Sequence, residues 1–170
     1  MKMRGFTLIE MLVVIVILSI LITLGSKGLS RARMNAKKAQ AQVEMKSIET
    51  AVMAYFNKYG KLPSDEFSAD TGLSLIATDN STLISILTVE ERDDPLNPAN
   101  IIFLEQQSTD SSRYVDPWGY DYIIGLDTDY DGILITVDGD ELRRKVAVVS
   151  IGLYETIGRG ETNDYIFSWQ

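Results

Sequence analysis

The sequence FTLIEMLVVIVILSILITL, residues 6–24, decides the fold of this 170-residue chain. Its 19 residues come close to the ~20 that cross a ~30 Å hydrocarbon layer as a helix. Glu10 is the one ionisable side chain in the run, and a charge inside a membrane span costs roughly 2.5–3.5 kcal/mol by insertion scales. We therefore predict a membrane-spanning helix over residues 6–25 in which Glu10 has a specific partner.

The residues that open this run resemble a known processing signature. A basic leader, MKMR, precedes Gly5-Phe6-Thr7-Leu8-Ile9-Glu10, which is similar to the amino-terminal signature of type IV pilins and type II secretion pseudopilins. The resemblance implies that residues 1–5 are a leader, that a prepilin peptidase cuts between Gly5 and Phe6, and that Phe6 becomes N-methylated. Two alternatives remain open from the residues: a secretory signal cleaved after Gly25, and an uncleaved membrane anchor.

Glu10 gains a physical role if the cleavage that the resemblance implies takes place. Cleavage would place a positive amine on Phe6 in an apolar setting, four residues from this carboxylate. A buried pair can recover desolvation free energy that an isolated charge cannot. Glu10 could pair with the amine of its own chain or of a neighbour. If the helices of a filament are staggered, Glu10 of one subunit meets the Phe6 amine of the next, so we expect Glu10 to act in assembly.

The helix is predicted to continue beyond the apolar run. No proline occurs between residues 26 and 59, and Gly60 with Pro63 provides a stop signal. One apolar stripe repeats in steps of three and four residues, and it consists of Met45, Ile48, Val52, Tyr55 and Tyr59. We therefore expect an amphipathic continuation over residues 26–60 that packs against a globular domain.

Residues 61–115 have a less regular pattern. Asn80 or Ser81 could cap a short helix that runs to Leu87, and residues 101–104 are predicted as a short buried strand. The charged residues 90–94 are predicted as a solvated loop and residues 108–112 as a surface turn. This part of the chain is expected to be a variable region of loops with one short helix.

Residues 116–170 show the pattern of strands and turns. Apolar runs over residues 120–126, 133–137 and 142–151 are separated by Asp- and Gly-rich turns, which predicts a three-stranded antiparallel meander. Asp116-Pro117-Trp118-Gly119 resembles the segment that opens the carboxyl-terminal sheet of major pseudopilins, with Trp118 expected as a core anchor against the long helix. The expected fold class is α+β, the type IV pilin-like fold: a long N-terminal helix packed by its second half against a small antiparallel sheet.

The composition excludes many chemical functions. The chain has no Cys and no His, which removes disulfides, thiol and imidazole catalysis, and most zinc and haem sites. Residues 1–62 carry a net charge of +7 and residues 63–170 a net charge of −15. The acidic half is suited to cations rather than to nucleic acid, and we do not expect an enzyme.

The acidic turn after residue 126 has the spacing of a calcium-binding loop. Asp127, Asp129 and Asp131 occupy positions 1, 3 and 5, with a glycine at position 6 and Asp138 at position 12. The flanking residues are predicted strands rather than helices, so this is not an EF-hand. The alternative is an acidic hairpin turn whose aspartates accept hydrogen bonds from backbone amides.

The family resemblance implies a second calcium position. Major pseudopilins typically bind calcium in the loop between the last strand and the carboxyl terminus. Ser150 and Asp164 match that pattern here, whereas Tyr154 stands where an aspartate is usual. The alternative is an ordered loop packed by Tyr154 and Trp169.

The resemblance implies a structural, non-catalytic subunit of the major pseudopilin type. Such a subunit waits as a single-pass protein in the bacterial inner membrane with its carboxyl-terminal domain in the periplasm, then forms a homo-oligomeric helical filament, the pseudopilus, which drives type II secretion. The implied partners are membrane lipid, prepilin peptidase, minor pseudopilins and the inner-membrane assembly platform. The alternatives are a type IV pilus or DNA-uptake filament subunit, and a membrane-anchored calcium-binding or recognition protein that does not polymerise.

Overall fold

The computed structural model describes residues 6–63, 80–89, 94–105, 113–136, 139–152 and 165–169, with the side chains of residues 24–28 excepted. The contacts divide the chain into two compact units, Met1–Lys37 and Lys38–Gln170. One helix, α1, runs from Leu8 to Tyr59 and contributes to both units. Its length confirms the predicted long helix.

The ends of α1 follow from local chemistry. No proline lies within Leu8–Tyr59, so no residue removes a backbone donor from the helix interior. Gly60 ends the helix with φ of +72°, and its N–H donates to Phe56 O at 2.7 Å. This left-handed glycine after the last turn is a common helix C-cap.

The core of the second unit is built on the apolar stripe of α1. Met45, Ile48, Val52 and Tyr55 are fully buried, and Tyr59 packs against them while partly exposed, as predicted. Each fully buried side chain of this size contributes roughly 1.5–3 kcal/mol of transfer free energy. The stripe packs against α2 (Ser81–Thr88), against Tyr122, and against sheet residues that include Leu126, Val148 and Ile166.

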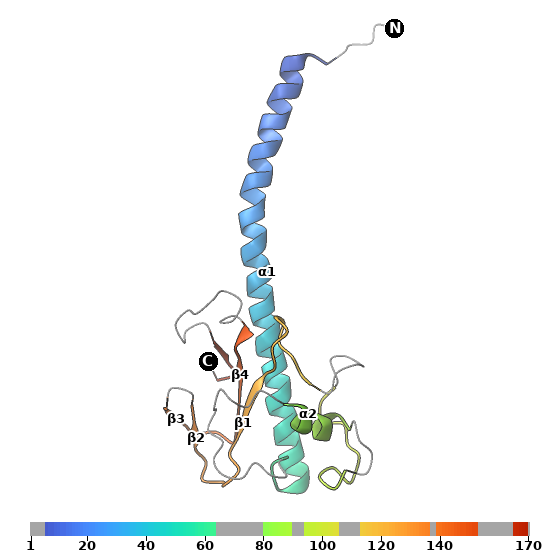
Figure 1. Cartoon of the computed structure of the whole chain (residues 1–170), viewed down its shortest axis with the longest axis vertical. Helices are drawn as coiled ribbons and strands as arrows, with labels where there is room; N and C mark the ends of the chain where they lie inside the picture. The colour runs from blue at the N-terminus through green and yellow to red at the C-terminus, as the bar shows by residue number, and fades with distance from the viewer. Residues whose placement is uncertain are drawn as a thin grey trace. The chain divides into compact units, whose positions relative to one another are not determined.

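A three-stranded antiparallel sheet completes this core. It has the order β1 (Ile123–Leu126), β4 (Val146–Ser150), β5 (Ile166–Phe167), with Ile123 opposite Val149 and Val149 opposite Phe167. The central strand β4 is buried along its whole length, because alternate residues face the α1 core and a second apolar cluster on the other side. In Figure 1 the sheet and α2 lie along opposite sides of the carboxyl-terminal half of α1.

An antiparallel sheet is present as predicted, but the predicted meander of three consecutive strands is wrong, and β5 was not among the predicted strands. β2 (Leu134–Ile135) and β3 (Glu141–Leu142) form a separate two-stranded sheet, and β1 pairs directly with β4. The run 142–151 is not one strand, because three basic residues, 143–145, interrupt it between β3 and β4. The five buried residues of β4 then offer β1 a longer and more apolar partner than the two residues of β2.

The middle of the chain brings two further corrections. Residues 101–104 form no strand; instead the amides of Phe103 and Leu104 both donate to Leu87 O, at 2.8 and 3.0 Å, beyond the end of α2. Asn80 stands at the N-cap position of α2 without a capping hydrogen bond from its side chain. Its carboxamide instead donates to Tyr114 O at 2.7 Å and accepts from Tyr114 N at 3.1 Å, so it ties two distant segments together.

The remaining predictions for this region have mixed outcomes. The short helix is confirmed as α2, and Trp118 packs against the core while remaining half-buried. The predicted turn at residues 108–112 and most of the predicted charged loop, residues 90–93, lie outside the described residues.

Candidate functional site

The first turn of α1 holds Glu10 in a defined position. Glu10 Oε2 accepts hydrogen bonds from Thr7 Oγ1 at 2.7 Å and from Thr7 N at 2.8 Å, and Glu10 N donates to Thr7 Oγ1 at 3.3 Å. Because α1 begins at Leu8, Thr7 is the N-cap residue and Glu10 is the third helical residue. The pair forms a reciprocal capping box, which satisfies amides that the first turn of a helix leaves unpaired.

This geometry gives Glu10 a partner within its own chain. The carboxylate also lies at the positive end of the helix macrodipole, which favours a negative charge there. The sequence reasoning identified Glu10 but missed Thr7. The signal was present, because Thr-x-x-Glu before an apolar run is the pattern of a capping box. Gly5 lies outside the described residues, and Phe6 is 75 % exposed.

The apolar side chains of residues 6–23, in the first part of α1, are not covered by other described residues of the chain. Every side chain from residue 6 to residue 23 is exposed, including Leu8 at 85 % and Ile22 at 70 %. Contiguous exposed apolar surface of this kind marks a contact with other proteins or with lipid. A membrane span was predicted over residues 6–25, but no helix in the described part of the chain is long and apolar enough to cross a membrane.

Comparison with known families identifies the amino-terminal pattern. Residues 1–26 match the model of the prokaryotic N-terminal methylation motif. The match supports a type IV pilin-like protein of the membrane-anchored type, with prepilin-type processing and the role of a structural filament subunit. The α+β architecture is consistent with a type IV pilin-like fold. No curated protein and no solved structure matches this chain.

The acidic loop after β1 brings Asp127, Asp129 and Asp131 together. One carboxylate oxygen of each lies within 4.8 Å of the others. Each aspartate also accepts one hydrogen bond from a backbone amide of the loop: Asp127 from Gly132 N at 3.2 Å, Asp129 from Asp131 N at 3.2 Å, and Asp131 from Ile133 N at 2.7 Å. These hydrogen bonds are the ones expected of an acidic hairpin turn. The same three carboxylates also form a cluster of the kind that binds cations.

Asp127 differs from its two neighbours in its environment. It is 1 % exposed, whereas Asp129 and Asp131 are exposed. Its burial, together with the nearby Asp129 and Asp131, raises the pKa of Asp127 above its usual range, although the Gly132 amide opposes this. Asp138, the fourth predicted ligand, lies outside the described residues.

Ser150 contacts the carboxylate of Asp116, which the sequence pattern indicated only as part of the turn that opens the sheet. Ser150 Oγ donates to Asp116 Oδ2 at 2.6 Å, and Gly152 N donates to the same oxygen at 3.0 Å. Asp116 Oδ1 accepts from the amides of Trp118 at 2.9 Å and Tyr120 at 3.0 Å. Buried Asp116 therefore organises the turn that opens the sheet and joins it to the end of β4.

The second predicted calcium site, formed by Ser150 and Asp164, is not tested by the structure. Asp164 and Tyr154 lie outside the described residues. Ser150, the other predicted ligand, is fully buried and hydrogen-bonded to a protein carboxylate. A role for Ser150 and Asp164 in calcium binding remains a prediction.

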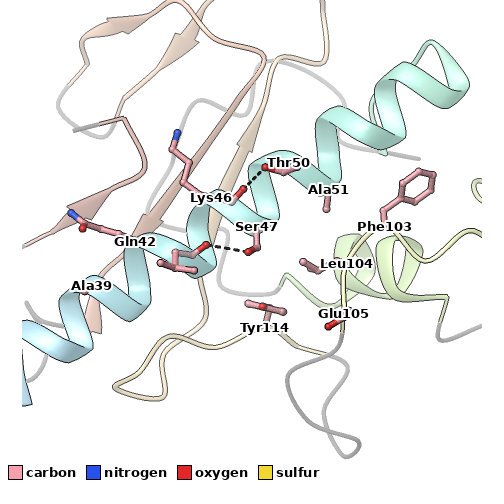
Figure 2. A pocket seen from close by; sticks show the side chains of 11 residues that line it. Ala39, Gln42, Lys46, Ser47, Thr50, Ala51, Phe103, Leu104, Glu105 and Tyr114 are labelled. Atoms are coloured by element: carbon pink, nitrogen blue, oxygen red, sulfur yellow. Dashed lines mark hydrogen bonds between the residues drawn. The ribbon is translucent and has the colours of Figure 1, made fainter.

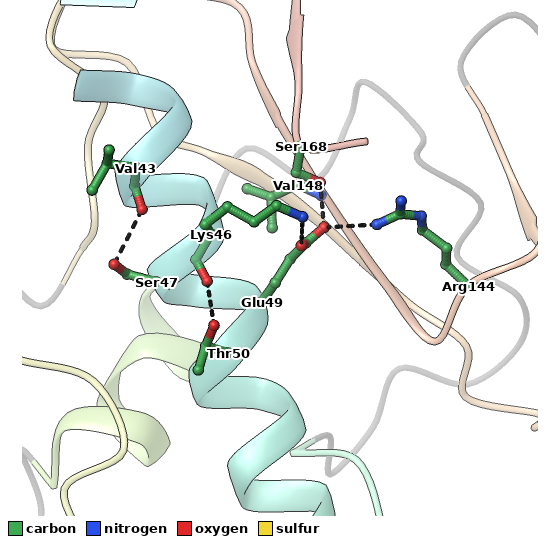
Figure 3. Close-up of polar contacts among 8 residues, drawn as sticks. All are labelled: Val43, Lys46, Ser47, Glu49, Thr50, Arg144, Val148 and Ser168. Atoms are coloured by element: carbon green, nitrogen blue, oxygen red, sulfur yellow. Dashed lines mark hydrogen bonds and ion pairs between the residues drawn. The ribbon is translucent and has the colours of Figure 1, made fainter. Parts of the chain in front are cut away.

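A second polar cluster joins the helix to the carboxyl-terminal end of the chain (Figure 3). Glu49 is 8 % exposed and accepts from Ser168 Oγ at 2.5 Å and from Lys46 Nζ at 2.6 Å, with Arg144 Nη1 at 3.6 Å. Ser168 Oγ in turn accepts from Val148 N at 3.0 Å. This cluster ties α1, β4 and the residues after β5 into one unit.

A groove of about 810 Å³ lies between α1 and the segment 103–105 (Figure 2). The hydroxyls of Ser47 and Thr50 donate to the helix carbonyls of Val43 and Lys46, at 3.1 and 2.7 Å. Val43, which also lines the groove, is 67 % exposed. The helix side of the groove also includes the polar side chains of Gln42 and Lys46, so it presents a mixed apolar and polar contact surface.

Proposed function

We propose that this chain is a major-type pseudopilin that polymerises into a periplasmic filament and drives protein secretion through a type II secretion system. In this proposal the chain is processed between Gly5 and Phe6, waits in the inner membrane, and then joins a homo-oligomeric helical filament. Minor pseudopilins, prepilin peptidase and the inner-membrane assembly platform are its proposed partners. The observation that carries the proposal is the methylation motif over residues 1–26, with Glu10 placed at the start of α1.

The apolar surface of α1 supports assembly. The side chains of residues 6–23 are exposed on all sides of the helix, so this segment needs a surrounding of lipid or of other helices. Membrane anchoring is supported by the motif, and packing against copies of the same segment would cover the same surface. The two environments fit the two successive states of a filament subunit.

Two features favour secretion over a type IV pilus or a DNA-uptake filament. The Asp116-Pro117-Trp118-Gly119 turn resembles that of major pseudopilins, and Asp116 accepts four hydrogen bonds that link this turn to β4. The chain has no cysteine, whereas paired carboxyl-terminal cysteines are common in type IV pilins. Deleting the gene separates the two proposals, because a pseudopilin mutant loses exoprotein secretion and a pilin mutant loses surface filaments or DNA uptake.

Mass spectrometry of the mature amino terminus tests the processing step. An N-methylated Phe6 is expected. A chain that begins after Gly25 would indicate ordinary secretion, and an intact Met1 would indicate a plain anchor or a protein that does not polymerise. Either result would refute the proposed filament function.

The role of Glu10 is tested by comparing three variants in an assembly assay. Glu10→Val and Glu10→Gln both remove the charge, and we expect each to be processed yet absent from sedimented filaments. Thr7→Val removes the hydroxyl of the capping box but keeps the carboxylate, so it should weaken the first turn by about 1 kcal/mol and still assemble. Normal filaments from Glu10→Val would overturn the assembly role, and equal loss from Thr7→Val would show that capping, rather than the charge, matters.

A further inference from the structure

The acidic loop between β1 and β2 contains a buried carboxylate oxygen that the protein leaves unpaired. Asp127 Oδ1 has no hydrogen-bond partner among the described residues, and neither does the buried hydroxyl oxygen of Thr128 next to it. Buried polar atoms are nearly always paired, so each exception needs an explanation. We propose that Asp127, Asp129 and Asp131 bind a calcium ion, and that the bound ion holds Tyr130 against the end of α1.

The spacing of the three carboxylates fits a calcium ion. Calcium binds oxygen ligands at ~2.3–2.6 Å, so two ligands on opposite sides of the ion lie about 5 Å apart. One oxygen of each aspartate lies within 4.8 Å of the others, inside that diameter. The three side chains can therefore reach one ion without a change in the course of the loop. Calcium takes six to eight oxygens, and backbone carbonyls and water can complete the set.

The charges of the loop have no cationic partner among the described residues. No Lys or Arg nitrogen in the described part of the chain lies within 4 Å of the carboxylates of Asp127, Asp129 or Asp131. Lys145, whose carbonyl oxygen accepts the Asp127 amide at 3.0 Å, directs its ammonium over the Phe56 ring, 4.2 Å from the centroid. A divalent cation would supply the missing positive charge and a partner for Asp127 Oδ1.

Tyr130 connects this loop to the end of the long helix. It lies between two of the proposed ligands and has φ of +63°, a conformation that is uncommon for a non-glycine residue. Its hydroxyl oxygen accepts from Leu62 N at 2.9 Å, and its ring centroid lies 6.4 Å from that of Phe56. An ion bound by Asp129 and Asp131 would fix the backbone on both sides of Tyr130, and so would stabilise its contacts with Phe56 and Leu62. The proposal goes beyond filament assembly, which does not depend on it.

Thermal unfolding of the full-length protein, stripped with EDTA and returned to buffer with CaCl2, tests the site. At a calcium concentration of ~100 Kd the melting temperature should rise by about 5–10 °C. Asp129→Asn changes an exposed ligand and should abolish most of the shift. Glu141→Gln is the matched control, because it neutralises an exposed acid on β3 outside the cluster, and it should shift as the wild type does. An equal concentration of MgCl2 should have a smaller effect, since Mg²⁺ demands tighter octahedral geometry.

Hydrogen exchange distinguishes a specific effect of calcium on the Tyr130 contacts from a general increase in the stability of the protein. Calcium should slow exchange of the Leu62 amide in the wild type, because that amide bonds to Tyr130, and should not do so in Asp129→Asn. No calcium-induced shift in melting would overturn the proposal. A full shift in Asp129→Asn would place calcium elsewhere in the chain, and would also overturn it. If calcium binds but the exchange rate of the Leu62 amide does not change, the proposal that the ion holds Tyr130 against the end of α1 is refuted.

Discussion

Replacement of Glu49 by alanine should destabilise the second unit by about 2–4 kcal/mol. The largest part comes from the hydrogen bond that Glu49 accepts from buried Ser168, because hydrogen bonds to charged groups contribute ~1.5–3 kcal/mol. The ion pairs with Lys46 and Arg144 add little, since these side chains are 59 % and 39 % exposed, and exposed pairs contribute ~0–1 kcal/mol each. At roughly 3 °C per kcal/mol for a domain of this size, the melting temperature should fall by ~6–12 °C.

Urea unfolding of the full-length chain, followed by tryptophan fluorescence, measures this loss. Glu49→Gln keeps an oxygen that can accept from Ser168, and should cost ~1 kcal/mol. Lys46→Met removes only the exposed partner and should cost less than ~1 kcal/mol. A double-mutant cycle of Glu49→Ala with Ser168→Ala should give a coupling of at least ~1 kcal/mol. The reasoning is refuted if Glu49→Ala changes stability by less than ~0.5 kcal/mol, or if Lys46→Met is equally destabilising.

Two further changes test the sheet and the acidic loop. In Gly152→Ala the new Cβ would lie 2.3 Å from Asp116 Oδ2, so unfolding measurements should show a loss of about 1–3 kcal/mol; an unchanged stability would contradict the close approach. In EDTA, the stability that Asp127 contributes should be fully present below the pKa of an unfolded aspartate, ~3.9, and be lost as the pH rises through its raised folded pKa. Asp127→Asn removes this titration, so its free energy of unfolding should change less over that pH range. If the free energy of unfolding of the wild type instead rises with pH over that range more than that of the variant, the predicted loss of stability is contradicted.

The helical part of the fold was predictable because its signals are local. The stripe Met45, Ile48, Val52 and Tyr55 repeats at the helical period, and the structure buries all four side chains. Gly60 carried an equally local stop signal, and α2 starts where it was predicted although the side chain of Asn80 does not cap it. The triple-aspartate loop was predictable for the same reason, since alternate residues of one tight turn must lie close together.

The strand pairing was not predictable in this way. β1 pairs with β4, and β4 with β5, across long separations in the chain, and the two-residue strand β5 is too short to show a period. The predicted meander, in which β1 would pair with β2, does not form. Burying both faces of β4 removes more apolar surface from water than pairing β1 with the short β2 would. Such a comparison requires the tertiary structure.

The sequence by itself determined the elements whose physics acts within a few residues: the long helix, its processing signature and the acidic loop. Only the tertiary structure decided the partners of the polar side chains. Asn80 joins Tyr114 instead of capping α2, Asp116 gathers the turn and β4, and Glu49 meets Ser168. A buried polar group must be paired, but which partner it finds depends on segments that only folding brings together.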